Sequence, residues 1–187
     1  MRKISFIISA IMVSFLLMSF YSYQPVKGEH EYIGVKKCGM CHKKEKEGNQ
    51  LKIWEGSAHA KAYKTLQTKE ADEIAKKAGH TTKAVETDAC LKCHAPAHNV
   101  DAKLLDKKFD IADGVQCEDC HGAGGDYKSN KVMKDVKAAV ENGLIIYADD
   151  KAIEKQCKTC HNEESPTYKP FVFADKYAKI KHNIPKN

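Results

Sequence analysis

Arginine is nearly absent from this chain of 187 residues. All but one of its 31 basic residues are lysine, and the single arginine is Arg2. Lysine is a flexible point charge, whereas the guanidinium group supplies the rigid fork with which proteins read nucleic-acid bases. The formal net charge of +6 alone would suggest an anionic partner. With so little arginine, we expect no nucleic-acid partner.

The sequence also lacks linkers and strands. No Pro/Gly/Ser-rich stretch or charge block divides residues 29–187, and no segment alternates convincingly between apolar and polar positions. These absences predict a single domain, mainly helical with much irregular coil. The expected helices cover 45–66, the stretch from a Thr68 cap to Gly79, Asn130–Asn142, a helix capped by Asp150, and about 173–182.

No cysteine is left over for a disulfide or a free thiol. All eight belong to four Cys-x-x-Cys-His motifs: Cys38/Cys41/His42, Cys90/Cys93/His94, Cys117/Cys120/His121 and Cys157/Cys160/His161. On a helical turn this spacing places both thiols beside the histidine. The pattern is the attachment signature of c-type haem, whereas zinc or redox Cys-x-x-Cys pairs need no following histidine. We therefore expect four covalently bound haems, with the motif histidines as proximal iron ligands.

Four haems are too many for a chain of this size to enclose in a conventional core. About 160 residues would remain after removal of an N-terminal signal, roughly forty for each haem. The haems themselves should therefore be the centre of the fold, closely packed. Their propionates would bring the mature holoprotein close to zero net charge, so we expect the lysines to serve propionates and solvent.

Long apolar runs are absent except at the N-terminus. Arg2 and Lys3 precede the apolar stretch Ile4–Phe20, which is followed by the polar stretch Tyr21–Gly28. This order predicts a signal peptide over residues 1–28 and an extracytoplasmic, periplasmic protein. The alternative is an uncleaved membrane anchor, since about 20 apolar residues span a bilayer. A membrane association is expected only if this segment is retained.

Methionine is too scarce to supply the second axial ligands. After the signal only Met40 and Met133 remain, and Met40 lies between two cysteines of one motif. Five histidines lie outside the motifs: His30, His59, His80, His98 and His182. His59 and His182 are the stronger candidates for distal ligands, while His30, His80 and His98 are weaker ones. Bis-histidine haems have low potentials, because methionine is the ligand that raises them.

Several stretches together resemble one family. They are Tyr32–His42, Trp54–Ala62, the third motif in Gly114–Gly122, and Ser165–Pro170 followed by a late histidine. With these stretches the chain resembles the cytochrome c-554 type of tetrahaem cytochrome over most of residues 32–182. The resemblance implies a periplasmic electron shuttle, with His59 serving the third haem and His182 the fourth.

The chain departs from that family at one place. The resemblance implies a distal histidine shortly after the third motif, serving the first haem, but residues 122–130 contain none. Either His30, His80 or His98 replaces it, or the first haem is five-coordinate, as the second haem of the family typically is.

The leading expectation is therefore an electron carrier between redox proteins rather than an enzyme. One alternative is a small nitrogen-oxide reductase or nitric-oxide-binding protein acting at a five-coordinate haem. Another is a membrane-anchored, quinol-oxidising tetrahaem cytochrome. The oligomeric state stays open.

Overall fold

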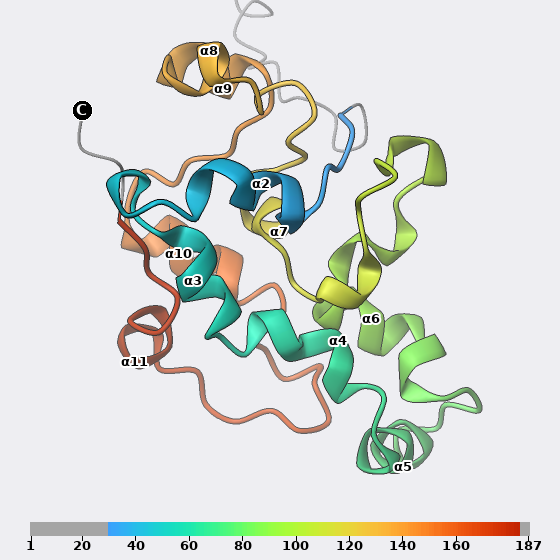
Figure 1. The fold of residues 1–187 in the computed structure, drawn as a ribbon. Coiled ribbons are helices and arrows are strands. Elements are labelled where there is room, and N and C mark those ends of the chain that lie inside the picture. Colours follow the sequence, from blue (N-terminus) through green and yellow to red (C-terminus); the bar gives the residue numbers. More distant parts are fainter. Residues whose placement is uncertain (1–29, 184–187) are drawn as a thin grey trace, which may run out of the picture.

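Helices and turns make up the structure, a computed structural model that describes residues 30–183 (Figure 1). The helices are α2 (Val35–His42), α3 (Gln50–Glu55), α4 (Ala62–Thr65), α5 (Lys69–Lys77), α6 (Asp88–His94), α7 (Cys117–His121), α8 (Asn130–Met133), α9 (Val136–Glu141), α10 (Asp150–Cys157) and α11 (Phe173–Tyr177). Short 3₁₀ turns are η2 (Glu45–Glu47), η3 (His59–Lys61), η4 (Ala84–Glu86), η5 (Pro96–Asn99), η6 (Ala102–Leu104) and η7 (Ile111–Asp113).

Within residues 30–183 there is no strand, only an isolated parallel bridge between Tyr32 and Leu105. The predicted class, mainly helical with much coil, is confirmed. None of the helices in this described part is long and apolar enough to cross a membrane. The predicted signal, residues 1–28, lies outside the described residues.

The single helix predicted over 45–66 is wrong. The segment is divided into η2, α3, η3 and α4. Gly48 has a φ of 98°, a left-handed conformation that favours glycine and ends η2. Gly56 then ends α3 before His59 begins η3. The apolar spacing was helical, but the two glycines interrupt it.

The helix predicted after Thr68 is confirmed as α5. The Thr68 hydroxyl accepts a hydrogen bond from the Ala71 amide at 3.2 Å, and Gly79, with a φ of 90°, follows its end. The helix predicted over Asn130–Asn142 is instead two helices, α8 and α9. Asp135 separates them, because its carboxylate caps α9 by accepting from the Ala138 amide at 3.1 Å.

Two helix ends near the C-terminus differ from prediction. The cap of α10 is Asp149, one residue before the predicted Asp150, and its carboxylate accepts from the Ala152 amide at 2.8 Å. The last helix, α11, ends at Tyr177. A tight turn follows, in which the Lys181 amide donates to the Tyr177 carbonyl, so His182 lies beyond the helix.

Among residues 30–183, protein side chains form two small buried clusters. The first consists of Leu66, Ala75, Ala84, Leu91 and Ala95, and the second of Tyr32, Ala97 and Ala123. Alanine dominates both, so each buries little apolar area.

Candidate haem-binding sites

Each Cys-x-x-Cys-His motif occupies a helical turn. The first motif lies on α2, the second on α6 and the third on α7. The fourth begins at the last residue of α10, and the His161 amide donates to the Cys157 carbonyl at 3.0 Å, which continues the helical pattern. The motifs therefore have the helical geometry that brings two thiols beside one histidine.

Three motif histidines have a hydrogen-bond partner on the same ring nitrogen. His94 Nδ1 lies 2.8 Å from the Ala62 carbonyl, and His121 Nδ1 lies 3.1 Å from the Ile145 carbonyl. His42 Nδ1 lies 3.3 Å from Gln50 Oε1. Since a carbonyl oxygen can only accept, Nδ1 carries the proton at His94 and His121, and Nε2 is left as the free lone pair. This tautomer and orientation are those of a histidine that ligates a metal through Nε2.

The motif thiols differ in the direction of their pKa shifts. Burial raises the pKa of the Cys120 thiol to about 12 and, with the neighbouring Cys160, raises that of Cys93 to about 11. A hydrogen bond with Cys38 lowers the pKa of Cys117. All eight cysteines are free of disulfides. All eight thiols are therefore available for thioether attachment.

Cys41 differs from the other seven motif cysteines in burial. Its side chain is exposed, whereas theirs are partly buried. Cys41 lies near the C-terminal end of α2, where the neighbouring Met40 is also 63% exposed.

The four motifs form one continuous row. Cys38 of the first motif shares a hydrogen bond with Cys117 of the third. Cys120, at the other end of the third motif, lies near Cys157 of the fourth. Cys93 of the second motif lies against Cys160, with its Sγ 4.0 Å from the Cys160 carbonyl oxygen. The spatial order is therefore first, third, fourth, second, which differs from the order in the sequence.

Buried hydrogen bonds connect the segment that begins the first motif's helix to the third motif. Glu118 is 2% exposed, and its carboxylate accepts from the amides of Ile33 (2.9 Å), Gly34 (2.8 Å) and Gly124 (2.6 Å). Gln116 accepts from the Val35 amide at 2.8 Å. The first turn of α2 has no side-chain cap of its own, so α7 satisfies its free N–H groups. Figure 1 shows α2 and α7 side by side.

His59 faces the proximal histidine of the fourth motif. The ring centres of His59 and His161 are 6.1 Å apart. An imidazole nitrogen lies about 2 Å from a metal that it ligates, so two imidazoles on opposite sides of one metal have centres about 6 Å apart. Burial and the nearby His161 lower the pKa of His59. A neutral imidazole is the form that binds a metal.

His182 faces the proximal histidine of the third motif in the same way. The ring centres of His182 and His121 are 5.8 Å apart. Burial, followed by the nearby His121, lowers the pKa of His182. Both candidate pairs therefore have the separation and the neutral character that an iron between two histidines requires.

The resemblance assigns His59 to the third haem and His182 to the fourth, and both assignments stay predictions, whereas in the structure the His59 ring lies near His161 and the His182 ring near His121. The backbone at His59 does pack against the segment before the third motif, where the Val115 amide donates to the His59 carbonyl at 3.2 Å. The ring, however, reaches His161. The C-terminal segment is held by a hydrogen bond from Gln50 to the Asn183 carbonyl, which places His182 beside the third motif.

The other three histidines do not face a motif histidine. His30 Nδ1 lies 2.5 Å from a carboxylate oxygen of Asp126. His98 is buried with no hydrogen bond on either ring nitrogen, and its Nε2 lies 3.6 Å from Asp88. His80 follows α5 beside a surface hollow. Within residues 30–183, ring contacts between histidines are confined to the pairs at His121 and His161.

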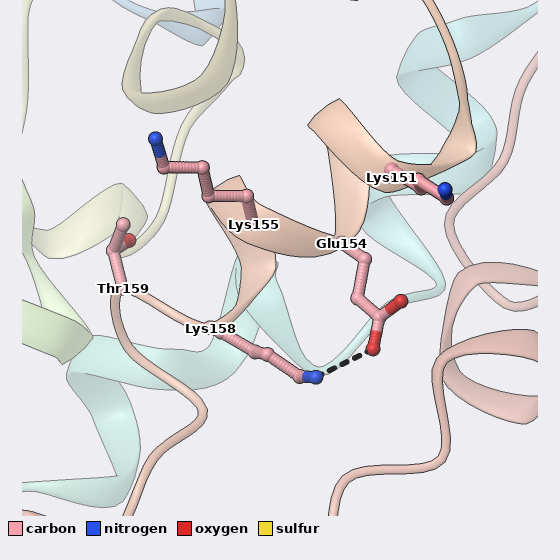
Figure 2. A pocket seen from close by; sticks show the side chains of 5 residues that line it. All are labelled: Lys151, Glu154, Lys155, Lys158 and Thr159. Atoms are coloured by element: carbon pink, nitrogen blue, oxygen red, sulfur yellow. Dashed lines mark ion pairs between the residues drawn. The ribbon is translucent and has the colours of Figure 1, made fainter.

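The surface beside the fourth motif is open and lysine-rich. Lys158 Nζ lies 2.6 Å from Glu154 Oε1. Figure 2 shows this ion pair, with Lys151 and Lys155 extending in different directions along α10. These side chains, together with Thr159, line a shallow hollow on the surface of α10 and the turn after it. Phe171 stacks on the His161 ring of the fourth motif, with ring centres 4.8 Å apart.

Sequence reasoning missed Gln50, Glu118 and Phe171. Each acts through a contact with a residue more than seven positions away, so no local pattern marked it. The tautomers, the spacing of the histidine pairs and the row of motifs together define a small multihaem cytochrome c.

Comparison with known proteins gives the same class. Residues 37–122 match the family described as cytochrome c554 and c-prime. The chain is 30% identical over 169 residues to cytochrome c-554 of Nitrosomonas europaea, covering 84% of this chain and 69% of that protein. No solved structure matches. The chain belongs to the cytochrome c-554 family, and it is a c-type cytochrome that carries electrons on covalently bound haem.

Proposed function

We propose that the chain is a periplasmic tetrahaem electron carrier that passes electrons between redox proteins along the row first, third, fourth, second. The observation that carries this proposal is the proximity of each motif to the next: Cys38 to Cys117, Gln156 beside Cys157 hydrogen-bonded to the Asp119 carbonyl, and Cys93 to the Cys160 carbonyl. Thioether bonds at those sulfurs would hold neighbouring haems close together. Bound haem would supply the reversible iron couple, leaving orientation and ligation to the protein.

His182 and His59 supply the distal ligands in this proposal, His182 at the third site and His59 at the fourth. Support comes from their separations from His121 and His161, 5.8 and 6.1 Å. Two-histidine ligation keeps potentials low. His42 and His94, in contrast, have no facing imidazole within the described residues.

We assign an open distal position to the first and second sites. Among the remaining histidines, His30 has one feature of a metal ligand, because an Nδ1–carboxylate hydrogen bond such as that to Asp126 is typical of a metal-binding histidine. Its ring does not face His42, however, so it does not take part in the proposed ligation.

Spectroelectrochemistry of the purified holoprotein tests the electron-transfer proposal. Four haems by mass and several overlapping low-potential steps are expected. A single high-potential, one-electron step would contradict it. The mass of the mature N-terminus tests export, since a start near residue 29 supports a cleaved signal and an intact N-terminus supports the anchor.

A second candidate function is the binding or reduction of a small nitrogen oxide at an open site. The observation that favours it is the lack of a facing histidine at His42 and His94 in the part of the chain that the structure describes. The resting electron paramagnetic resonance spectrum should then contain high-spin as well as low-spin iron. Uniformly low-spin iron would contradict this function while leaving electron transfer intact.

A further inference from the structure

The Gln50 side chain connects two different haem sites. Gln50 is the first residue of α3, and its Oε1 lies 3.3 Å from Nδ1 of His42, the proximal histidine of the first motif. Its Nε2 donates to the Asn183 carbonyl at 2.9 Å. Asn183 directly follows His182, which faces the third motif.

The orientation of this amide is fixed by its partners. Nε2 also donates to the Glu47 carbonyl, so both neighbours at that end of the amide are acceptors. The amide oxygen must then face His42, and His42 Nδ1 must be the donor. At His94 and His121 the acceptor is a backbone carbonyl, so the first motif differs in having an acceptor that a substitution can change.

A glycine at position 48 allows the Gln50 side chain and the Asn183 carbonyl to come this close. Gly48 has a φ of 98°, and a Cβ placed on it would lie 2.5 Å from the Asn183 carbonyl oxygen and 2.6 Å from Gln50 Nε2. Any side chain at position 48 would displace both partners. The glycine therefore gives the C-terminal segment room to reach Gln50.

We propose that Gln50 is a positioning residue for two haem sites at once: it orients and polarises His42 at the first site and holds His182 opposite His121 at the third. This inference rests on the proposed function, in which both motifs hold haem and His182 is a distal ligand.

The two roles have separate physical consequences. An acceptor on Nδ1–H makes the imidazole a stronger donor to iron, which favours the ferric form and lowers the potential. Gln50→Leu removes the acceptor, so the midpoint potential of one haem rises. Gln50→Glu keeps an acceptor and adds negative charge, so the same midpoint falls. Both variants lose the donor to Asn183, so both lose part of the low-spin signal of the third site.

The test compares wild-type holoprotein with Gln50→Leu and Gln50→Glu by spectroelectrochemical titration and electron paramagnetic resonance. Midpoint shifts of opposite sign are expected, together with a partial low-spin loss in both variants. A structural role alone would change stability without opposite shifts. Shifts of the same sign, or none, overturn the inference.

Gln156→Leu is the matched control. Gln156 Nε2 donates to the Asp119 carbonyl at 3.3 Å, between the third and fourth motifs, and neither end of its amide hydrogen-bonds a motif histidine. This variant should leave the midpoints and the low-spin signal unchanged. If Gln50→Leu does not mature, the fall in potential and the signal loss of Gln50→Glu, which has nearly the same shape, decide the question.

Haem counting separates this inference from the proposed function. Fewer than four haems in the wild-type protein would overturn the proposed function. Four haems without opposite midpoint shifts would overturn only the role of Gln50.

Discussion

The junction between the first and third motifs contains buried hydrogen bonds, whereas the junction between the second and fourth is only partly buried and has an exposed ion pair beside it. At the first–third junction, Glu118 and Gln116 of the third-motif segment accept the free amides at the start of α2. At the second–fourth junction, Cys93 meets the backbone of Cys160, and the accompanying ion pair between Lys92 and Glu164 is exposed.

Each junction nevertheless contains one motif with a facing histidine and one without. His182 faces the third motif and His59 faces the fourth, while the first and second motifs lack such a partner within residues 30–183. Two differently built junctions therefore have a similar placement of facing histidines. The difference suggests that the first–third junction contributes more to stability and that the second–fourth junction is more accessible to partners.

The largest effect should follow Glu118→Ala. Three buried amides would lose their acceptor, at about 1–3 kcal/mol each, so the free energy of unfolding should fall by about 3 kcal/mol or more. Chemical denaturation of the holoprotein measures this. Glu164→Ala, at the second–fourth junction, is the control and should leave the unfolding midpoint in place. Equal losses in the two variants would remove the contrast between the junctions.

The distal histidines offer the next test. His182→Ala and His59→Ala should each convert one low-spin iron to high-spin, because each removes the imidazole that faces a motif histidine. Electron paramagnetic resonance with haem counting measures the change. His80→Ala is the control, since His80 lies beside a surface hollow near α5 and should leave the spectrum unchanged. A spectrum unaltered by either distal substitution would refute the proposed ligand pairs.

The sequence predicted the local structure of the motifs better than their arrangement. The motifs are local, so their spacing specified helical turns without reference to the rest of the chain. Spacing did not reveal that Cys41 is exposed while Cys38, on the same helix, is partly buried and contacts the third motif. Which motif His59 or His182 would face depended on tertiary contacts, such as that between Gln50 and Asn183, 133 positions apart.

The long helix predicted over 45–66 failed for a local reason. Gly48 and Gly56 interrupt a pattern of apolar residues at helical intervals. Glycine weakens a helix interior, and at Gly48 the left-handed backbone ends the helical turn outright. The apolar spacing alone predicts one helix, and the two glycines divide the segment.

A smaller effect is expected from Gly114→Ala. Gly114 has a φ of 74°, and a Cβ there would lie 2.7 Å from the His59 carbonyl oxygen, so the substitution combines backbone strain with a steric clash. Such strain costs about 1–3 kcal/mol. The clash would displace the backbone of His59 and with it the imidazole that faces His161. In the electron paramagnetic resonance spectrum, the low-spin signal of the fourth site should therefore broaden, while that of the third site stays unchanged. Gly79→Ala is the control, since Gly79 has a similar φ of 90° but open space around it. It should cost stability without altering either signal.

The smallest effect should come from Lys92→Ala at the second–fourth junction. Lys92 and Glu164 are exposed, and an exposed ion pair is screened by water and salt, so no measurable change in the unfolding midpoint is expected. Thermal unfolding at low and high salt measures it. Lys37→Ala is the comparison on α2, where Lys37 pairs with the largely covered Asp106 side chain. A larger loss for Lys92→Ala than for Lys37→Ala would contradict the expectation that the exposed pair beside the second–fourth junction contributes little to stability.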